Sequence, residues 1–151
     1  MKEFNSIDDI LEFAITQEQR AIDFYSELAR NARSKEMKDV FLEFAGEEMK
    51  HKQRLTKIRE EGVFTMPREQ VTDLKISDYV VSAEPTPNMS YEEALVIAMK
   101  REKSAFKLYM SLSERAPNAD LKNVFLSLAM EESKHKLRFE LEYDDFVLRE
   151  N

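Results

Sequence analysis

The chain has 151 residues, of which 42% are hydrophobic and 35% are charged, and this composition predicts a single soluble globular domain over residues 1–151. A net charge of −7 argues against nucleic acid and membrane surfaces as partners, and the lack of cysteine excludes disulfides, cysteine-ligated metals and thiol catalysis. With no long apolar run and a polar N-terminus, we expect a cytoplasmic protein.

The first half of the sequence has the pattern of two helices joined by a short turn. Apolar residues recur every three or four positions, as expected for stripes that face the core of a helical bundle. Ser6 is a suitable N-cap at the start, and Gly62 would end the second helix. The predicted helices span about residues 6–32 and 34–61.

A long connection follows over residues 63–89. Its Pro67, Pro85 and Pro87 interrupt any long helix. We expect a crossover that contains a short helix or an extended stretch such as 74–81.

The second half repeats the pattern of the first. Ser90 and Glu93 form a capping box, and the predicted helices span about residues 90–116 and 118–149. Residues 11–60 align with residues 95–144 without a gap, and 18 of these 50 positions are identical. We interpret this match as an internal duplication of a helical hairpin.

Glutamates and histidines interrupt the four apolar stripes at equivalent positions. They are Glu18, Glu48 and His51, followed 84 residues later by Glu102, Glu132 and His135. Each glutamate lies about 22 Å from the turn of its hairpin, so all four can share one height near the middle of a bundle. The hairpins meet at that height even if their turns point to opposite ends. The second and third helices would then run parallel, and the crossover would travel the length of the bundle.

Four carboxylates on core-facing stripes predict a metal site. Buried, unpaired carboxylates are strongly disfavoured, and two divalent cations would balance four of them. A Glu-x-x-His pair presents both side chains on one helix face. Oxygen-rich ligands with one imidazole for each metal favour two iron ions, or manganese, over structural zinc. A single Glu-x-x-His pair usually lies on the exposed surface of a helix, and a glutamate in the core can instead specify how helices pair. Here the agreement in register, height and repeat favours the dinuclear site.

Several neighbouring residues have less specific interpretations. Glu47 and Glu131 lie one position off the stripes, and we expect them to face solvent. Glu142 lies on a stripe near a helix end, where a surface position is favoured over a ligand role. Tyr25 and Tyr109 are candidate catalytic residues, because each could hydrogen-bond to a ligand or act in redox chemistry; plain core packing is the other interpretation.

With this motif the chain resembles the ferritin-like di-iron carboxylate proteins, most closely the rubrerythrin-type branch, over nearly its whole length. The resemblance implies an all-α, ferritin-like four-helix bundle made of two duplicated hairpins, 6–61 and 90–149, joined by the crossover 63–89. It also implies the roles of the ligands. Glu18 and Glu102 would be terminal ligands, Glu48 and Glu132 would bridge the metals, and His51 and His135 would each bind one metal.

The sequence departs from typical rubrerythrins in two ways. It lacks the cysteines of their rubredoxin domain, so any electrons must come from a separate protein. It also has Ala105, and Ala21 in the repeat, where peroxide-reducing members carry an extra carboxylate three residues after the third-helix glutamate. Without this carboxylate to exchange with the histidine, we expect His51 to be a permanent ligand. We also expect the small side chains of Ala21 and Ala105 to leave room beside the metals.

The leading functional hypothesis is a di-iron oxidoreductase, an enzyme of the peroxidase or oxidase type. It would react with peroxide or dioxygen, receive electrons from a separate donor protein, and form a homo-oligomer, with a dimer favoured. The alternative is an iron-binding, ferroxidase or iron-storage protein without an organic substrate, and storage implies a large multi-subunit shell. A purely structural metal bundle is the third hypothesis, and it predicts no reaction with peroxide.

Overall fold

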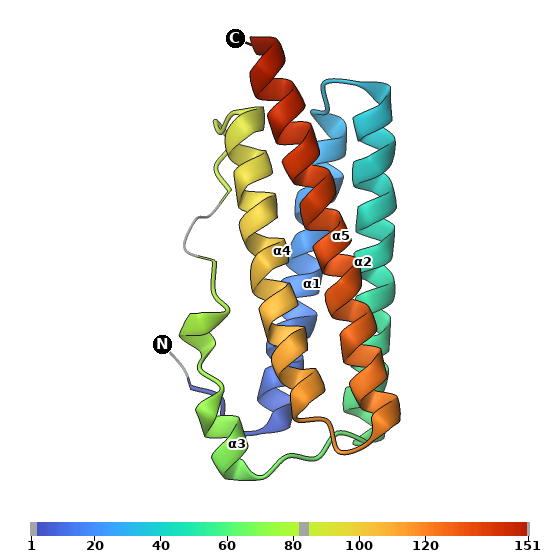
Figure 1. Cartoon of the computed structure of the whole chain (residues 1–151), viewed down its shortest axis with the longest axis vertical. Coiled ribbons are helices and arrows are strands. Elements are labelled where there is room, and N and C mark those ends of the chain that lie inside the picture. Colours follow the sequence, from blue (N-terminus) through green and yellow to red (C-terminus); the bar gives the residue numbers. More distant parts are fainter. Residues whose placement is uncertain (1–2, 82–84, 151) are drawn as a thin grey trace.

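The structure, a computed structural model, describes residues 3–81 and 85–150. Four long helices form an all-α bundle, and no strand occurs among the described residues (Figure 1). The helices are α1 (Ile7–Arg30), α2 (Lys35–Glu61), α3 (Arg68–Asp73), α4 (Tyr91–Glu114) and α5 (Ala119–Glu150), with a short 3-10 helix, η1, at Ile76–Asp78. The long helices begin and end within two residues of the ranges expected from the sequence.

The helix ends are formed by the residues that the sequence pattern singles out. The hydroxyl of Ser6 accepts a hydrogen bond from the backbone N–H of Asp9 at 3.2 Å. Ser90 and Glu93 make both hydrogen bonds of a capping box at the start of α4. Gly62 ends α2 with a φ of 63°, a left-handed conformation that glycine adopts without the steric penalty of a side chain.

The two hairpins are arranged so that their turns lie at opposite ends of the bundle (Figure 1). Helices α1 and α2 form one hairpin and α4 and α5 the other, and the closest backbone packing occurs within each hairpin. Helices α2 and α4 therefore run parallel, as expected. The crossover between them, which includes α3 and η1, travels the length of the bundle (Figure 1). Because the backbones of the two hairpins approach each other less closely, side chains at their interface hold the bundle together.

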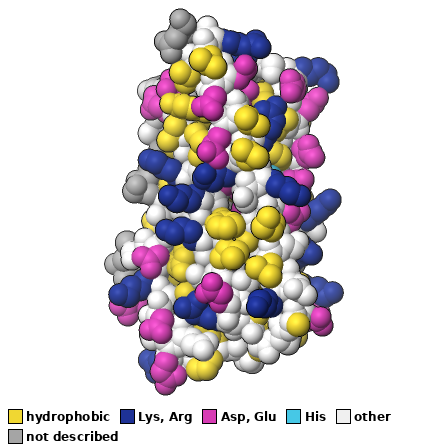
Figure 2. All heavy atoms as spheres, in the orientation of Figure 1, with side chains coloured by type: hydrophobic (Ala, Val, Ile, Leu, Met, Phe, Trp, Pro, Cys, Tyr) yellow, Lys and Arg dark blue, Asp and Glu magenta, His cyan; other side chains and the backbone are white. Residues whose placement is uncertain are grey.

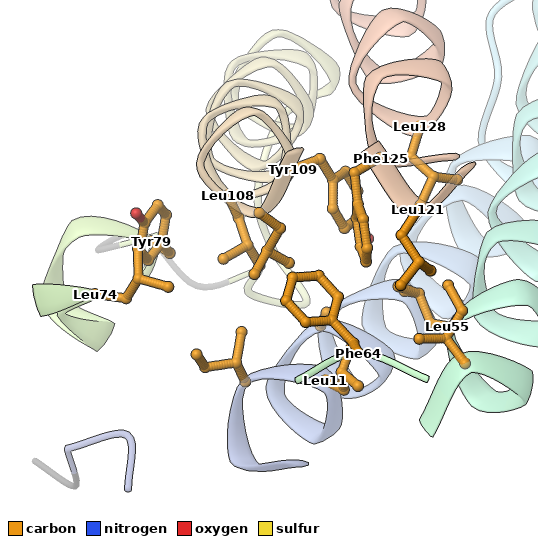
Figure 3. Close-up of a cluster of buried hydrophobic side chains, with 14 of the residues drawn as sticks. Leu11, Leu55, Phe64, Leu74, Tyr79, Leu108, Tyr109, Leu121, Phe125 and Leu128 are labelled. Carbon is orange, nitrogen blue, oxygen red and sulfur yellow. The ribbon is translucent and has the colours of Figure 1, made fainter. Parts of the chain in front are cut away.

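The hydrophobic core consists of two clusters, one above and one below the middle of the bundle as drawn in Figure 1. The lower cluster includes Leu55 and Phe125, and the crossover residues Phe64 and Tyr79 pack against it (Figure 3). The upper cluster is rich in aromatic rings from α1, α2 and α5. Burial of each large side chain contributes about 1.5–3 kcal/mol, so the clusters stabilise the bundle on both sides of the polar region between them.

The face of the molecule that carries α5 shows both charged and apolar side chains (Figure 2). Figure 2 shows hydrophobic side chains gathered at mid-height on the face that carries α5. Large apolar side chains are exposed at intervals along this helix: Met130, Leu137, Leu141 and Leu148. Among the described residues, no helix is sufficiently long and apolar to cross a membrane.

Candidate metal centre

Six ionisable side chains meet in the middle of the bundle, between the two hydrophobic clusters. They are Glu18 from α1, Glu48 and His51 from α2, Glu102 from α4, and Glu132 and His135 from α5. All six are buried, with exposed fractions between 0% and 2%. The structure thus brings together every residue that the sequence pattern proposed as a metal ligand.

The six side chains form two overlapping groups, and the donor atoms within each group lie within 4.8 Å of one another. Glu48 and Glu132 belong to both groups. The first group adds Glu18 and His51, and the second adds Glu102 and His135. The shared glutamates occupy the positions that bridging ligands need, and each remaining pair lies on one side of them.

Many of the atoms in this cluster that could bind a metal ion have no hydrogen-bond partner. Among the described residues, seven buried side-chain atoms have no hydrogen-bond partner: Glu18 Oε2, both carboxylate oxygens of Glu48, His51 Nδ1, Glu102 Oε2, Glu132 Oε1 and His135 Nδ1. An unsatisfied buried polar atom costs about 1–3 kcal/mol. Two metal ions would satisfy these atoms, so the residues fit a dinuclear metal group.

Both histidines direct Nδ1 towards the carboxylates. His51 Nδ1 lies 3.2 Å from Glu132 Oε1, and His135 Nδ1 lies 2.9 Å from Glu48 Oε1, without an aligned hydrogen bond in either case. The two imidazole rings are nearly parallel, at 12°, and their centroids are 6.5 Å apart. Each ring can therefore serve a separate metal ion, with the shared glutamates between them.

Two carboxylates and a histidine of the apo cluster have a raised pKa, so they hold protons more tightly than the free side chains do. Burial, and then the charges of the neighbouring carboxylates, raise the pKa of Glu48 and Glu132 well above the usual value for glutamate. Burial alone would lower the pKa of His135, but its contacts with Glu102 and Glu48 outweigh burial and raise this pKa to about 11. Because metal ligands must be deprotonated, metal ions compete with these protons.

Two tyrosines link the hairpins at the same height. Tyr25 of α1 donates a hydrogen bond to Glu102 of α4, and Tyr109 of α4 donates one to Glu18 of α1. Burial and the adjacent carboxylate raise the pKa of both tyrosines well above 10, so both hydroxyls remain protonated donors. The contact with ligand candidates that the sequence allowed is therefore present, and a catalytic role for these tyrosines stays a prediction.

Glu47 and Glu131 face solvent only in part: their side chains are 32% and 37% exposed, but each also contacts a buried histidine, which the sequence analysis did not anticipate. Glu131 Oε2 lies 2.8 Å from His51 Nε2, and Glu47 makes the equivalent contact with His135 Nε2. Each lies one residue before a buried glutamate, and its side chain is directed towards the histidine of the neighbouring helix instead of directly outward. The block Glu-Glu-x-x-His, which both halves contain, was the signal that could have revealed them.

Glu142 is also not a surface residue, although it is no member of the metal-binding groups. Its side chain is buried, with a residue exposure of 3%, and Arg33 contacts both carboxylate oxygens at 2.8 and 3.1 Å. Tyr91 donates a further hydrogen bond at 2.9 Å. No pattern in the sequence indicated that Arg33, in the turn between α1 and α2, would reach the last turns of α5.

A small cavity adjoins the cluster between α1 and α4. It has a volume of about 30 Å³, and its walls include Glu18, Glu102 and the expected small residues Ala21 and Ala105. Tyr79 of the crossover also lines it. A space of this size holds one or two molecules as small as water.

Comparisons with known proteins agree with this geometry. A family model described as Rubrerythrin matches residues 9–85 and 93–151. A solved structure of a provisionally assigned ferritin-like diiron-carboxylate protein from Thermotoga maritima superposes with a TM-score of 0.77 at 24% sequence identity, covering 95% of this chain and 98% of that chain. Comparison with curated proteins gives no match. The likeness to the solved structure confirms the ferritin-like fold expected from the sequence.

Proposed function

The chain belongs to the rubrerythrin family, and from this premise we propose that it is a di-iron oxidoreductase that reacts with peroxide or dioxygen and receives electrons from a separate protein. One observation carries the proposal. Two sets of buried glutamate and histidine donors overlap in Glu48 and Glu132, which is the arrangement that a pair of metal ions needs.

The chemistry of the donor set supports iron. One metal would be held by Glu18, Glu48, His51 and Glu132, and the other by Glu48, Glu102, Glu132 and His135. Carboxylate oxygens with one imidazole for each metal suit iron or manganese, whereas structural zinc is more often bound by thiolates. When bound, iron would supply the redox equivalents and the Lewis acidity for the reaction with the oxidant.

The protein's own residues would control what reaches the centre. The hydrophobic clusters above and below exclude bulk water from the ends of the bundle. The hydroxyls of Tyr25 and Tyr109 hold the terminal carboxylates through hydrogen bonds. The cavity beside Ala21 and Ala105 has a volume of about 30 Å³, which is the scale of an oxidant with two oxygen atoms and favours peroxide or dioxygen.

The proposed enzyme would form an assembly of few subunits. The apolar side chains exposed along α5 support self-association, for which a dimer is the simplest form. A large closed shell would instead favour iron storage. Measurement of the native mass by light scattering therefore separates the two functions.

The test of the proposed reaction is rapid mixing of the Fe²⁺-loaded protein, prepared without oxygen, with peroxide or with dioxygen. We expect both irons to be oxidised in a single fast phase, followed by re-reduction when a protein electron donor is supplied. The matched control is the variant E48Q/E132Q, which lacks both shared carboxylate charges. A loaded wild-type protein that is inert to both oxidants would refute the reaction and leave only a structural metal bundle.

A further inference from the structure

The far side of each histidine ring, away from the carboxylate cluster, is held by a glutamate of the other hairpin. His51 of α2 contacts Glu131 of α5 through Nε2 at 2.8 Å, and His135 of α5 contacts Glu47 of α2 in the same way. Arg54 lies 4.0 Å from the same oxygen of Glu131. The two contacts are related by the repeat of 84 residues, so one geometry occurs twice.

A histidine must be neutral to bind a metal ion, and in that form these contacts determine which ring nitrogen carries the single proton. An ionised carboxylate can only accept a hydrogen bond, so Nε2 must donate its hydrogen to the glutamate. In a neutral imidazole the lone pair then resides on Nδ1, the nitrogen that faces Glu18, Glu48, Glu102 and Glu132. Nδ1 is also the nitrogen that lacks a hydrogen-bond partner in both rings.

We propose that Glu47 and Glu131 are positioning residues of the metal centre, each of which orients the histidine of the opposite hairpin and holds it in the tautomer that can bind metal. This inference rests on the proposed metal centre, since an oriented histidine matters only if it is a ligand. Carboxylates that accept a hydrogen bond from a ligating histidine typically change metal affinity by about 10–100-fold when they are removed.

The placement of the two glutamates agrees with this role. Their side chains are 32% and 37% exposed, so they lie at the rim of the bundle between the buried rings and the solvent. They also connect α2 to α5, the pair of helices that carries both histidines. A purely structural tie between the hairpins would affect stability, but it would not affect the protonation of an imidazole nitrogen.

The experiment compares E47A/E131A with the control E43A/E60A, which removes the same number of charges from exposed positions of α2. Co²⁺ binding is measured by titration against a competing chelator and by the visible absorption of bound Co²⁺. The Zn²⁺-loaded proteins, without a histidine tag, are then labelled with ¹⁵N at histidine. Because the chain has only two histidines, the spectrum contains only their two rings.

We expect each alanine substitution to weaken Co²⁺ binding by about 10–100-fold and to alter the Co²⁺ spectrum. In the wild type, both Nε2 nitrogens should be protonated and exchange slowly with water; in E47A/E131A the exchange should be faster. E47Q/E131Q keeps an acceptor oxygen without the charge and should recover part of the affinity. If the double variant does not fold, E47A and E131A are measured singly.

Two results would overturn the inference in distinguishable ways. If the wild type binds two Co²⁺ ions and E47A/E131A matches the control in affinity, spectrum and proton exchange, the glutamates do not position the histidines, and the metal centre stands. If the wild type itself binds no Co²⁺ at this cluster, the proposed function and this inference fail together.

Discussion

At the residue scale, the six clustered side chains combine burial with charge, and this combination makes the centre depend on cations or protons. The raised pKa of Glu48 and Glu132 shows that the folded apo protein holds protons that the unfolded chain would release. Such a group stabilises the fold below its unfolded pKa of about 4.5, and this stabilisation is lost as pH rises towards the folded pKa. The raised pKa of His135 acts in the same direction between 6.5 and about 11.

The substitution Glu48→Gln tests this linkage. Glutamine cannot ionise, so as pH rises above about 4.5 the apo variant should lose less stability than the wild type, by up to about 1.4 kcal/mol per pH unit for one proton. Removal of a residue that only supports a ligand typically lowers metal affinity by about 10–100-fold. Because Glu48 would itself be a ligand, Glu48→Gln should lower the affinity by more than this. Chemical denaturation at several pH values and metal titration measure both effects. Glu43→Gln, an exposed change on the same helix, is the control, and equal metal affinity in the two variants would argue strongly against Glu48 as a bridge.

Ala105 leads to a second prediction at this scale. Position 105 follows Glu102 by three residues and therefore lies on the same helix face, next to the cavity. With alanine there, we expect no carboxylate to replace His51, which should stay bound in both oxidation states. Ala105→Glu should supply a seventh ligand, bind the oxidised pair more tightly and change the rate with peroxide. Crystal structures of the oxidised and reduced wild type provide the check, and departure of His51 from the metal in either state would refute the argument.

At the element scale, polar contacts reinforce the bundle at one end. Arg33, in the turn between α1 and α2, forms an ion pair with buried Glu142 of α5 and also contacts Asp145. Tyr91 at the start of α4 completes the group. These contacts join both hairpins and the start of α4, where the backbones of the hairpins approach each other less closely than the helices within each hairpin.

Arg33→Ala should therefore destabilise the protein by about 1–3 kcal/mol, because it leaves the carboxylate of Glu142 buried with only a tyrosine as donor. In a domain of this size, each 1 kcal/mol lowers the melting temperature by about 2–4 °C. Arg30→Ala is the control, since its ion pair with Glu27 is largely exposed and should contribute less than about 1 kcal/mol. Equal melting temperatures for the two variants would show that the buried pair does not stabilise the bundle.

Much of this arrangement could be predicted from sequence because it depends on residues within one helix. Caps such as Ser6, Ser90 and Gly62 define the helix ends, and the spacing of Glu48 and His51 defines a shared face. What could not be predicted depends on a second helix. Glu131 is polar and lies beside the apolar stripe, and only the position of α2 against α5 shows that it reaches a histidine.

The same limit applies to Glu142. Its place on the stripe was visible, but its burial depends on an arginine more than one hundred residues away in the sequence. The crossover is a further case, since its proline-rich pattern indicated only a short helix or an extended stretch. The structure has α3 and η1 there, and Tyr79 packs into the lower cluster and donates a hydrogen bond to Ser111 of α4.

At the scale of the whole molecule, the cluster of buried glutamates and histidines lies where the two hairpins meet. The hydrogen bonds of Tyr25, Tyr109, His51 and His135 all cross from one hairpin to the other at this height. The donor atoms of each metal group likewise come from both hairpins. Bound metal should therefore join the hairpins and stabilise the folded state by mass action, as any ligand of the native protein does.

Anomalous diffraction at the iron absorption edge, from crystals of protein loaded with Fe²⁺ in the absence of oxygen, tests the central claim most directly. The predicted result is two iron peaks in each chain. One should be bound by Glu18, Glu48, His51 and Glu132, and the other by Glu48, Glu102, Glu132 and His135. A map with no iron at this cluster, or with a single iron bound without His51 and His135, would contradict the dinuclear centre.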